Sequence, residues 1–198
     1  MVFDIKDFYP SIKESLLIEA LDFAATHVRI SRSDLETVRQ ARKSLLFDGS
    51  HTWIKRDGGL FDVTMGAFDG AEVCELVGTY LLSLISQTYE KKDIGLYRDD
   101  GLAVFKNRSG PQNERIKKKI QQIFKDKGLE AVIQCNRKIV DYLDITFNLN
   151  DGSFRPCRKP EDETLYINVD SDHPPSILKQ LPISIEKRLS SISSSEAV

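Results

Sequence analysis

The 198-residue sequence has few cysteines and no long apolar run, and each shortage excludes a class of protein. Its three cysteines, Cys74, Cys135 and Cys157, have no short spacing between them, so neither a disulfide framework nor a zinc knuckle is indicated. The longest apolar run, 73–85, is interrupted by Glu75 and is too short to span a bilayer. The first seven positions include two acidic residues and do not resemble a signal peptide. These absences predict an intracellular protein without a membrane partner, and they leave nucleus and cytoplasm both open.

The sequence also lacks an excess of positive charge. Its formal net charge is −2 and its pI is about 6.0, which is not the strongly basic balance of a nucleic-acid binder judged by bulk charge. Any contact with nucleic acid must therefore depend on the local distribution of charge. At 198 residues and 40% apolar content, the chain is long enough for one domain with a sizeable core and an incomplete second one.

Two adjacent carboxylates, Asp99 and Asp100, lie between two short apolar runs that end at Tyr97 and begin at Leu102. This pattern predicts a tight β-hairpin with both aspartates at its tip. Neighbouring like charges raise each other's pKa unless a cation lies close by, so the pair suggests a divalent metal, with magnesium as the natural ion. The alternative is a solvated turn, because Asp and Gly are the commonest turn residues.

A second acidic position near the start of the chain shifts the balance between these alternatives. An apolar strand over 2–5 carries Asp4, and an aromatic-rich turn and a helix beginning near Ser11 follow it. A strand-borne aspartate together with a hairpin pair is what two-metal nucleotidyl transfer needs, with ions about 3.5–4 Å apart that clamp the attacking and leaving oxygens. The two acidic positions together are much more specific than either alone.

These stretches resemble the palm of a reverse transcriptase. The segment Phe-Asp-Ile-Lys-Asp-Phe-Tyr at 3–9 is similar to the first catalytic motif of that family, and Tyr-Arg-Asp-Asp at 97–100 is similar to its Tyr-x-Asp-Asp box. Residues 63–72 lie where the family has its Gly-containing template and nucleotide motif, although Phe-Asp-Gly at 68–70 replaces the Pro-Gln-Gly of many members. The most similar subfamily is the polymerase of Penelope-like retroelements, and the likeness covers nearly the whole chain.

The resemblance implies addition of a dNTP to the 3′-hydroxyl of a DNA primer on an RNA template. It implies that Asp4, Asp99 and Asp100 hold two Mg²⁺ ions, with Mn²⁺ as a substitute metal. It also implies that Tyr9 is the aromatic gate that excludes a ribose 2′-hydroxyl. The residues implied to contact the nucleotide or the template are Lys6, Asp7, Phe8, Tyr9, Gly66, Phe68, Asp69 and Gly70.

The resemblance assigns further roles beyond residue 136. Lys138 is the best match to a lysine that protonates the pyrophosphate leaving group. A hairpin with one arm at 139–148, a turn at Asp151 and Gly152 and a second arm at 153–158 matches the primer grip. The residues implied to hold the primer end are Tyr142, Leu143 and Phe147.

Apolar periodicity and the resemblance together predict an α+β polymerase palm over 1–160, a βαββαβ antiparallel sheet with helices on one face. The start of a helical thumb is expected over 161–198, with a serine-rich end that frays. The expected helices are 11–24, one capped by Ser31 or Ser33 and running to Leu46, 71–89, about 111–127, 176–181 and 183–192. Strands are expected at 52–56, before a turn at 57–59, and at 129–134.

Two helices are expected to carry a basic face, and only the second has a functional alternative. The side chains of Arg32, Arg39, Arg42 and Lys43 are expected to form a solvated face. The lysine-rich face of the 111–127 helix is interpreted as solvated, with contact to a nucleic-acid backbone as the alternative.

Two rival functions remain open. An RNA-templated RNA polymerase shares the palm but typically has Gly before Asp-Asp and a polar gate, so Tyr97 and Tyr9 argue against it. The second rival is a catalytically inactive palm that only binds RNA or a protein partner, and the intact aspartates weigh against it. Because no fingers region precedes Asp4 in this sequence, we expect the 198-residue chain alone to be inactive. The oligomeric state stays open.

Overall fold

The computed structural model describes residues 1–54, 59–157, 167 and 171–194, and the chain forms two compact units, Met1–Asn136 and Arg137–Val198. The predicted boundary at residue 160 and most of the predicted 57–59 turn lie outside the described residues. The division after Asn136 places the predicted primer-grip segment in the C-terminal unit. Each unit is described by itself below.

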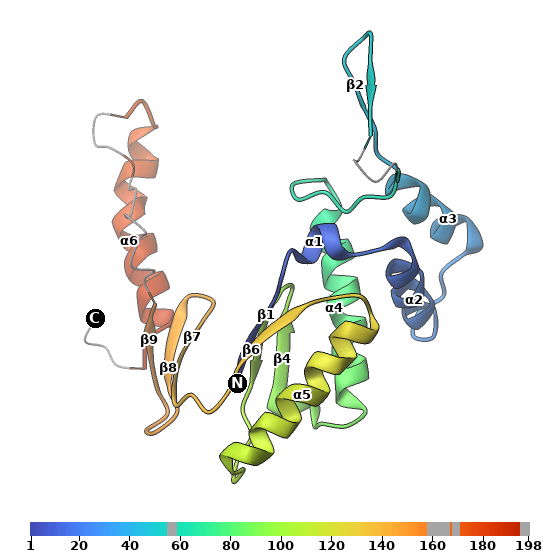
Figure 1. The fold of residues 1–198 in the computed structure, drawn as a ribbon. Helices are drawn as coiled ribbons and strands as arrows, with labels where there is room; N and C mark the ends of the chain where they lie inside the picture. Colours follow the sequence, from blue (N-terminus) through green and yellow to red (C-terminus); the bar gives the residue numbers. More distant parts are fainter. Residues whose placement is uncertain (55–58, 158–166, 168–170, 195–198) are drawn as a thin grey trace. The chain divides into compact units, whose positions relative to one another are not determined.

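The N-terminal unit contains a four-stranded antiparallel sheet with the strand order β4-β5-β1-β6. Its strands are β1 (Val2–Ile5), β4 (Ile94–Tyr97), β5 (Asp100–Ala103) and β6 (Ala131–Gln134). Helix α4 (Gly70–Ser86) precedes β4, and α5 (Gly110–Asp126) connects β5 to β6. Figure 1 shows both helices on the same side of the sheet. The predicted α+β fold, a βαββαβ palm, is confirmed.

Alternation along the strands explains why only one face of the sheet is covered. Phe3 and Ile5 are each 1% exposed, whereas Asp4 between them is exposed. In β6, Ile133 is buried and its neighbour Val132 is 51% exposed. Since successive side chains of a strand point to opposite faces, the apolar set packs against α4 and α5. Asp4 and Val132 therefore share the other face.

The closest packing in the sheet is between Phe3 of β1 and Gly101 of β5, which are direct cross-strand partners. A Cβ atom built on Gly101 would overlap the Phe3 ring. The same ring packs against Phe124 of α5, with ring centroids 5.8 Å apart. Gly101 therefore leaves the space in which the first strand and the hairpin share one core.

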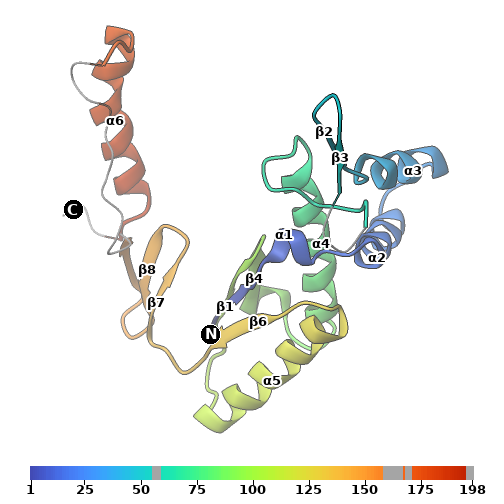
Figure 2. The same ribbon diagram turned by 45° about the horizontal axis from the view of Figure 1, so that its top comes forward.

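The connection from β1 to α4 forms α1 (Phe8–Ser11), α2 (Glu14–Ala25), α3 (Arg32–Ala41), β2 (Leu46–Phe47) and β3 (Thr52–Trp53). Ser31 is the cap of α3: its hydroxyl accepts from the Asp34 N–H at 3.1 Å, and Asp34 Oδ2 accepts from the Ser31 N–H at 3.1 Å. The predicted extension of this helix to Leu46 is wrong, because Leu46 pairs with Trp53 in the β2–β3 hairpin. Figure 2 shows this hairpin standing away from the sheet.

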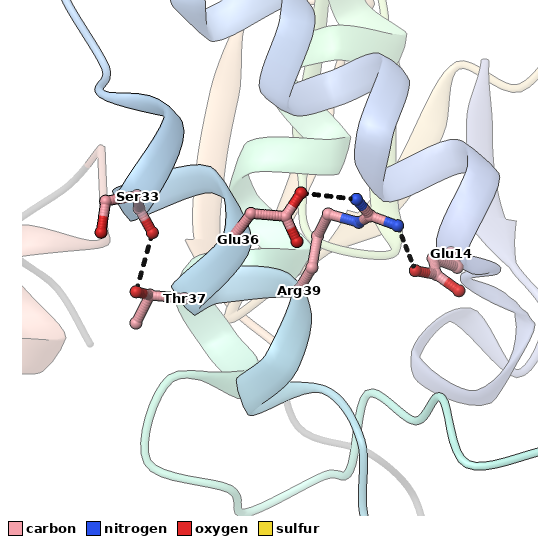
Figure 3. A network of polar contacts seen from close by, with 5 residues as sticks. All are labelled: Glu14, Ser33, Glu36, Thr37 and Arg39. Atoms are coloured by element: carbon pink, nitrogen blue, oxygen red, sulfur yellow. Dashed lines mark hydrogen bonds and ion pairs between the residues drawn. The ribbon is translucent and has the colours of Figure 1, made fainter.

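The basic side of α3 is not simply a solvated face. Arg39 donates from Nη1 to Glu36 at 2.9 Å and from Nη2 to Glu14 of α2 at 3.0 Å (Figure 3). In the same view the Thr37 hydroxyl donates to the Ser33 carbonyl at 2.8 Å. Arg39 thus links α2 to α3, which the prediction of a solvated face did not anticipate.

The C-terminal unit contains a three-stranded antiparallel meander and one helix. Its elements are β7 (Ile139–Tyr142), β8 (Ile145–Asn148), β9 (Ser153–Pro156) and α6 (Pro175–Ser191). The prediction of one continuous arm over 139–148 is wrong, because Tyr142 pairs with Ile145 across a turn at Leu143. Leu143 takes the positive φ of 53° that a tight turn uses. The chain does turn again between Asn148 and Ser153, where Gly152 has a φ of 80°.

Helix α6 replaces the two short helices predicted at 176–181 and 183–192. Pro182 lies inside this single helix and does not end it. Arg188 of α6 donates to Asp144 at 2.6 Å, and the Ser194 N–H donates to the Phe154 carbonyl at 2.8 Å. These contacts attach the helix and the segment after it to the meander. Across the described ranges, no helix is both long and apolar enough to cross a membrane.

We predict that Gly101→Ala destabilises the chain, because the added methyl would overlap the Phe3 ring. Overpacking of a well-packed core typically costs about 1–3 kcal/mol. Urea unfolding followed by circular dichroism measures the loss. Gly95→Ala in the same hairpin is the matched control, since a Cβ there would meet no atom within 4 Å. Adding Phe3→Leu to Gly101→Ala should make the two losses clearly non-additive. Equal losses at Gly95 and Gly101 would contradict this packing role.

Candidate active site

The cross-strand register brings the predicted carboxylates together. Tyr97, Asp100, Asp4 and Val132 are successive partners across β4, β5, β1 and β6, so they form one row. Direct partners in an antiparallel pair have side chains on the same face. Asp4 and Asp100 therefore lie next to each other on the face that α4 and α5 leave exposed.

The turn of the β4–β5 hairpin carries Asp99 but not Asp100. Asp100 is the first residue of β5 and pairs with Tyr97, so Arg98 and Asp99 alone form the turn. The prediction that both aspartates lie at the tip is wrong for Asp100. Arg98 takes the positive φ of 55° that allows so tight a turn. The Ile5 N–H donates to the Asp99 carbonyl at 3.0 Å, which fixes Asp99 beside the strand that carries Asp4.

The pKa of Asp4 lies above the ordinary value of an aspartate. Partial loss of hydration is the largest cause, and the negative charges of Asp99 and Asp7 add to it. The charged form of Asp4 is therefore disfavoured by the carboxylate with which it shares the site. A cation bound between Asp4 and Asp99 would relieve this repulsion.

The acidic residues fit a magnesium site of the kind that a substrate completes. Within the described part of the chain, no group of three or more His, Cys, Asp or Glu side chains could hold a metal ion. Magnesium in phosphate-transfer sites is usually bound by one or two carboxylates together with substrate phosphates, and not by an all-protein cage. The electrostatic coupling of Asp4 and Asp99 supplies such a pair.

Tyr9 lies close to the carboxylates. It belongs to α1, and Cys74 of α4 is among the groups that raise the pKa of its phenol, after burial. Cys74 is fully buried, and burial raises its pKa to about 12, so the thiol stays neutral and unreactive. The pKa of Tyr9 is raised by burial and is sensitive to the charges of Arg98 and Asp99, which places the ring near the hairpin turn.

Arg98 and Glu75 are site residues that sequence reasoning did not identify. Arg98 forms an ion pair with Glu75 of α4 at 3.7 Å, and its guanidinium lies over the Tyr97 ring at 5.3 Å from the centroid. These contacts hold the turn that carries Asp99 against the helix. The sequence feature that indicates such a contact is Glu75, because it is the one charged residue in the apolar run 73–85.

The remaining residues of the first motif have distinct positions. Lys6 is exposed and forms an ion pair with Glu130 at 3.7 Å. Asp7 has a positive φ of 48° and precedes α1. The side chain of Phe8 is 3% exposed and packs in the core, so only its backbone could contact a nucleotide.

The Gly-containing loop is attached to the core by Asp69. Asp69 forms an ion pair with Arg42, which is 5% exposed and was predicted to face solvent. This pair connects the end of α3 to the start of α4. Gly70 is required there, because a Cβ would lie 2.7 Å from the Thr64 carbonyl oxygen. Gly66 has a φ of 86°, and Phe68 is fully exposed and free to contact a base.

The residues predicted beyond position 136 belong to the C-terminal unit. The Lys138 carbonyl accepts from the Leu149 N–H at 2.7 Å, and Leu143 is exposed in the β7–β8 turn. Phe147 packs against Phe154 with ring centroids 6.1 Å apart. Tyr142 is the last residue of β7. The roles of these residues in leaving-group protonation and primer binding stay predictions.

No protein-family model and no curated protein matches the sequence. Solved structures do match the fold. Telomerase from Candida albicans, in complex with the TWJ fragment of telomeric RNA, is similar over 95% of this chain with a TM-score of 0.61 and 17% identity. Apo telomerase from Candida tropicalis, truncated from the C-terminal domain, is similar over 79% of this chain with a TM-score of 0.51 and 14% identity.

The chain spans about a third of the length of these telomerase chains, 34% and 35% respectively. At such low identity the likeness shows the fold alone, which is reverse-transcriptase-like. It does not extend to the Penelope-like subfamily.

We predict that Asp4→Asn leaves the melting temperature level or raises it near neutral pH without divalent metal. The folded chain raises the pKa of Asp4, so folding holds that proton more tightly, and stability falls as pH rises through the raised pKa. Asparagine removes this loss. Below the ordinary pKa of an aspartate, both chains are neutral at this position and the difference should vanish.

Thermal melting over a pH series measures this effect. Asp22→Asn is the matched control, because Asp22 is exposed on α2. A clear fall in melting temperature for Asp4→Asn at neutral pH would show that the charged form of Asp4 is not disfavoured in the folded chain.

Proposed function

We propose that this chain is part of an RNA-templated DNA polymerase, a reverse transcriptase that adds dNTPs to the 3′-hydroxyl of a DNA primer. The observation that supports it best is the pairing of Asp4 with Asp100 beside the Asp99 turn, on the exposed face of a reverse-transcriptase-like fold. The RNA in the Candida albicans telomerase structure supports RNA as a partner. The motifs at 3–9 and 97–100 favour a retroelement polymerase of the Penelope-like kind.

In this proposal Asp4 and Asp99 hold two Mg²⁺ ions, and Asp100 assists them. The bound ions would lower the pKa of the primer hydroxyl and neutralise the triphosphate. The protein's own contribution is positioning. The Ile5–Asp99 hydrogen bond sets the spacing of the two carboxylates, and the Arg98–Glu75 ion pair keeps the turn in place.

The same proposal gives Tyr9 the task of choosing the sugar. Its ring is partly buried and lies near Cys74, Arg98 and Asp99. A rigid ring beside the carboxylates would occupy the space of a ribose 2′-hydroxyl. The exposed Phe68 of the Gly-containing loop would contact the template or the incoming base, since stacking tolerates any base.

We predict that Asp99→Asn and Asp4→Ala each reduce nucleotide addition by more than about a hundredfold. Each removes a metal ligand, and metal ions supply several kcal/mol of transition-state stabilisation, at about 1.36 kcal/mol for each tenfold in rate. The assay is Mg²⁺-dependent primer extension on an RNA template, with a longer protein that includes residues 1–198. Asp22→Asn should extend at the wild-type rate. Near-normal extension by Asp99→Asn would overturn the metal assignment, and inactivity of the wild type would favour a palm that only binds.

We predict that Tyr9→Val lowers the preference for dNTPs over rNTPs by about tenfold or more, because the ring no longer fills the space of the 2′-hydroxyl. The ratio of the two kcat/KM values measures this preference. Tyr9→Phe is the matched control: it keeps the ring and loses only the hydroxyl, so its ratio should stay close to wild type. An unchanged ratio in Tyr9→Val would remove Tyr9 from the site and favour the RNA polymerase alternative.

A further inference from the structure

A basic cavity of about 250 Å³ lies between the segment after α4 and the first half of α5. Three cations line it: Arg108 before α5, and Arg115 and Lys119 on the helix. Arg115 and Lys119 are four residues apart, so they lie on the same stripe of α5. Tyr89 and Ile116 also line the cavity.

The three cations differ from other lysines of the region in their ion pairing. Among the residues that the structure describes, none of Arg108, Arg115 and Lys119 forms an ion pair. Other lysines of the same region do: Lys117 pairs with Glu114 at 3.9 Å, and Lys127 pairs with Glu19 at 2.5 Å. Three like charges around one cavity repel each other, and a bound phosphate would convert that repulsion into charge-assisted hydrogen bonds.

The rest of the lining combines the polar side chains of Thr88 and Gln112 with Tyr89 and Ile116. Ile116 is 9% exposed. The Tyr89 ring packs edge-on against Phe105, with centroids 5.5 Å apart. Burial raises the pKa of Tyr89, and the charge of Arg108 opposes that shift, so the guanidinium lies near the phenol. An aromatic wall beside cations is the combination with which proteins bind single-stranded nucleic acid.

This cavity is separate from the carboxylate row. The row crosses the β4–β5 hairpin at its turn, where Tyr97 pairs with Asp100. The cavity lies beyond the opposite end, where Ile94 pairs with Ala103 and the Val104 N–H donates to the Asp93 carbonyl at 2.8 Å. At about 3.3 Å per strand residue the two ends of the hairpin are about 10 Å apart.

We propose that the cavity binds a phosphate of a single-stranded RNA outside the catalytic site. This inference rests on the RNA partner of the proposed function and adds a second contact to it. A continuous strand is favoured over a free nucleotide, because positive charge continues beyond the cavity. Residues 106–127 contain eight Lys or Arg and two acidic residues, in a chain whose net charge is −2. A strand passing the cavity would follow this basic surface of α5.

The test is RNA binding by the 198-residue chain, without dNTP or Mg²⁺, measured by the fluorescence anisotropy of a labelled oligouridylate over a salt series. We expect the triple variant Arg108→Ala, Arg115→Ala and Lys119→Ala to lower the salt slope of log K by about 0.7, the value for one phosphate contact on a single strand. The triple variant Lys106→Ala, Lys118→Ala and Lys125→Ala is the control, because it removes the same charge from exposed positions that do not line the cavity. Its affinity should stay several-fold higher than that of the cavity variant.

Equal losses in the two triple variants would overturn the cavity as a site and would indicate a diffuse basic surface. Displacement of RNA by tripolyphosphate at equal phosphate concentration would overturn the commitment to a strand and would indicate a free-phosphate site. Arg108→Lys with Arg115→Lys keeps the charge and should keep most of the binding, which separates lost contacts from lost folding. Primer extension is a separate measurement, so failure of the cavity would leave the polymerase proposal standing. Absence of RNA binding by the wild type would overturn both the cavity and the RNA partner.

Discussion

The packing of the Phe3 ring over Gly101 is the contact on which the rest of the site depends. It joins the first strand to the hairpin from the covered side of the sheet, with Phe124 of α5 behind the ring. Because side chains alternate along a strand, seating Phe3 in the core directs Asp4 to the opposite face. A register slip of one residue would bury Asp4 and expose Phe3. The position of the acidic residues is thus set by an apolar contact on the other side of the sheet.

The site combines repulsion between carboxylates with contacts that keep them from moving apart. Burial raises the pKa of Asp4, and the negative charge of Asp99 adds to this, so the two charges oppose each other in the absence of a cation. The Ile5–Asp99 backbone hydrogen bond and the Arg98–Glu75 ion pair hold the turn despite this opposition. Such preorganisation suits a site that gains its remaining ligands from a substrate, because the protein groups do not need to rearrange when the ions and phosphates arrive. The cations at the far end of the hairpin give the same unit a second, proposed place for phosphate.

The misassigned elements share one cause, which is that local patterns do not state which residues pair. The sequence at 97–100 predicts a turn centred on the two aspartates. In the structure Tyr97 pairs with Asp100, so the turn consists of Arg98 and Asp99. Leu46 has helical spacing with Leu35 and Val38, yet it pairs with Trp53 in a hairpin. Pro182 is a strong helix-ending signal, and α6 nevertheless continues through it. Arg42 is indistinguishable in sequence from its solvated neighbours until Asp69, far along the chain, proves to be its partner.

The sequence by itself determined most strands and helices of the α+β class, because alternation and apolar periodicity are local consequences of strand and helix geometry. Its resemblance to reverse transcriptases supplied the antiparallel palm and the main acidic residues. The motifs at 3–9 and 97–100 could be identified without coordinates, since each is a short contiguous stretch. Only the tertiary structure decided that Asp4 faces Asp100, that Cys74 lies near Tyr9 and that Glu75 pairs with Arg98 of the hairpin turn. Each of these is a contact between residues more than twenty positions apart in the chain. Such contacts depend on how strands and helices pack together, and that packing is a property of the whole core.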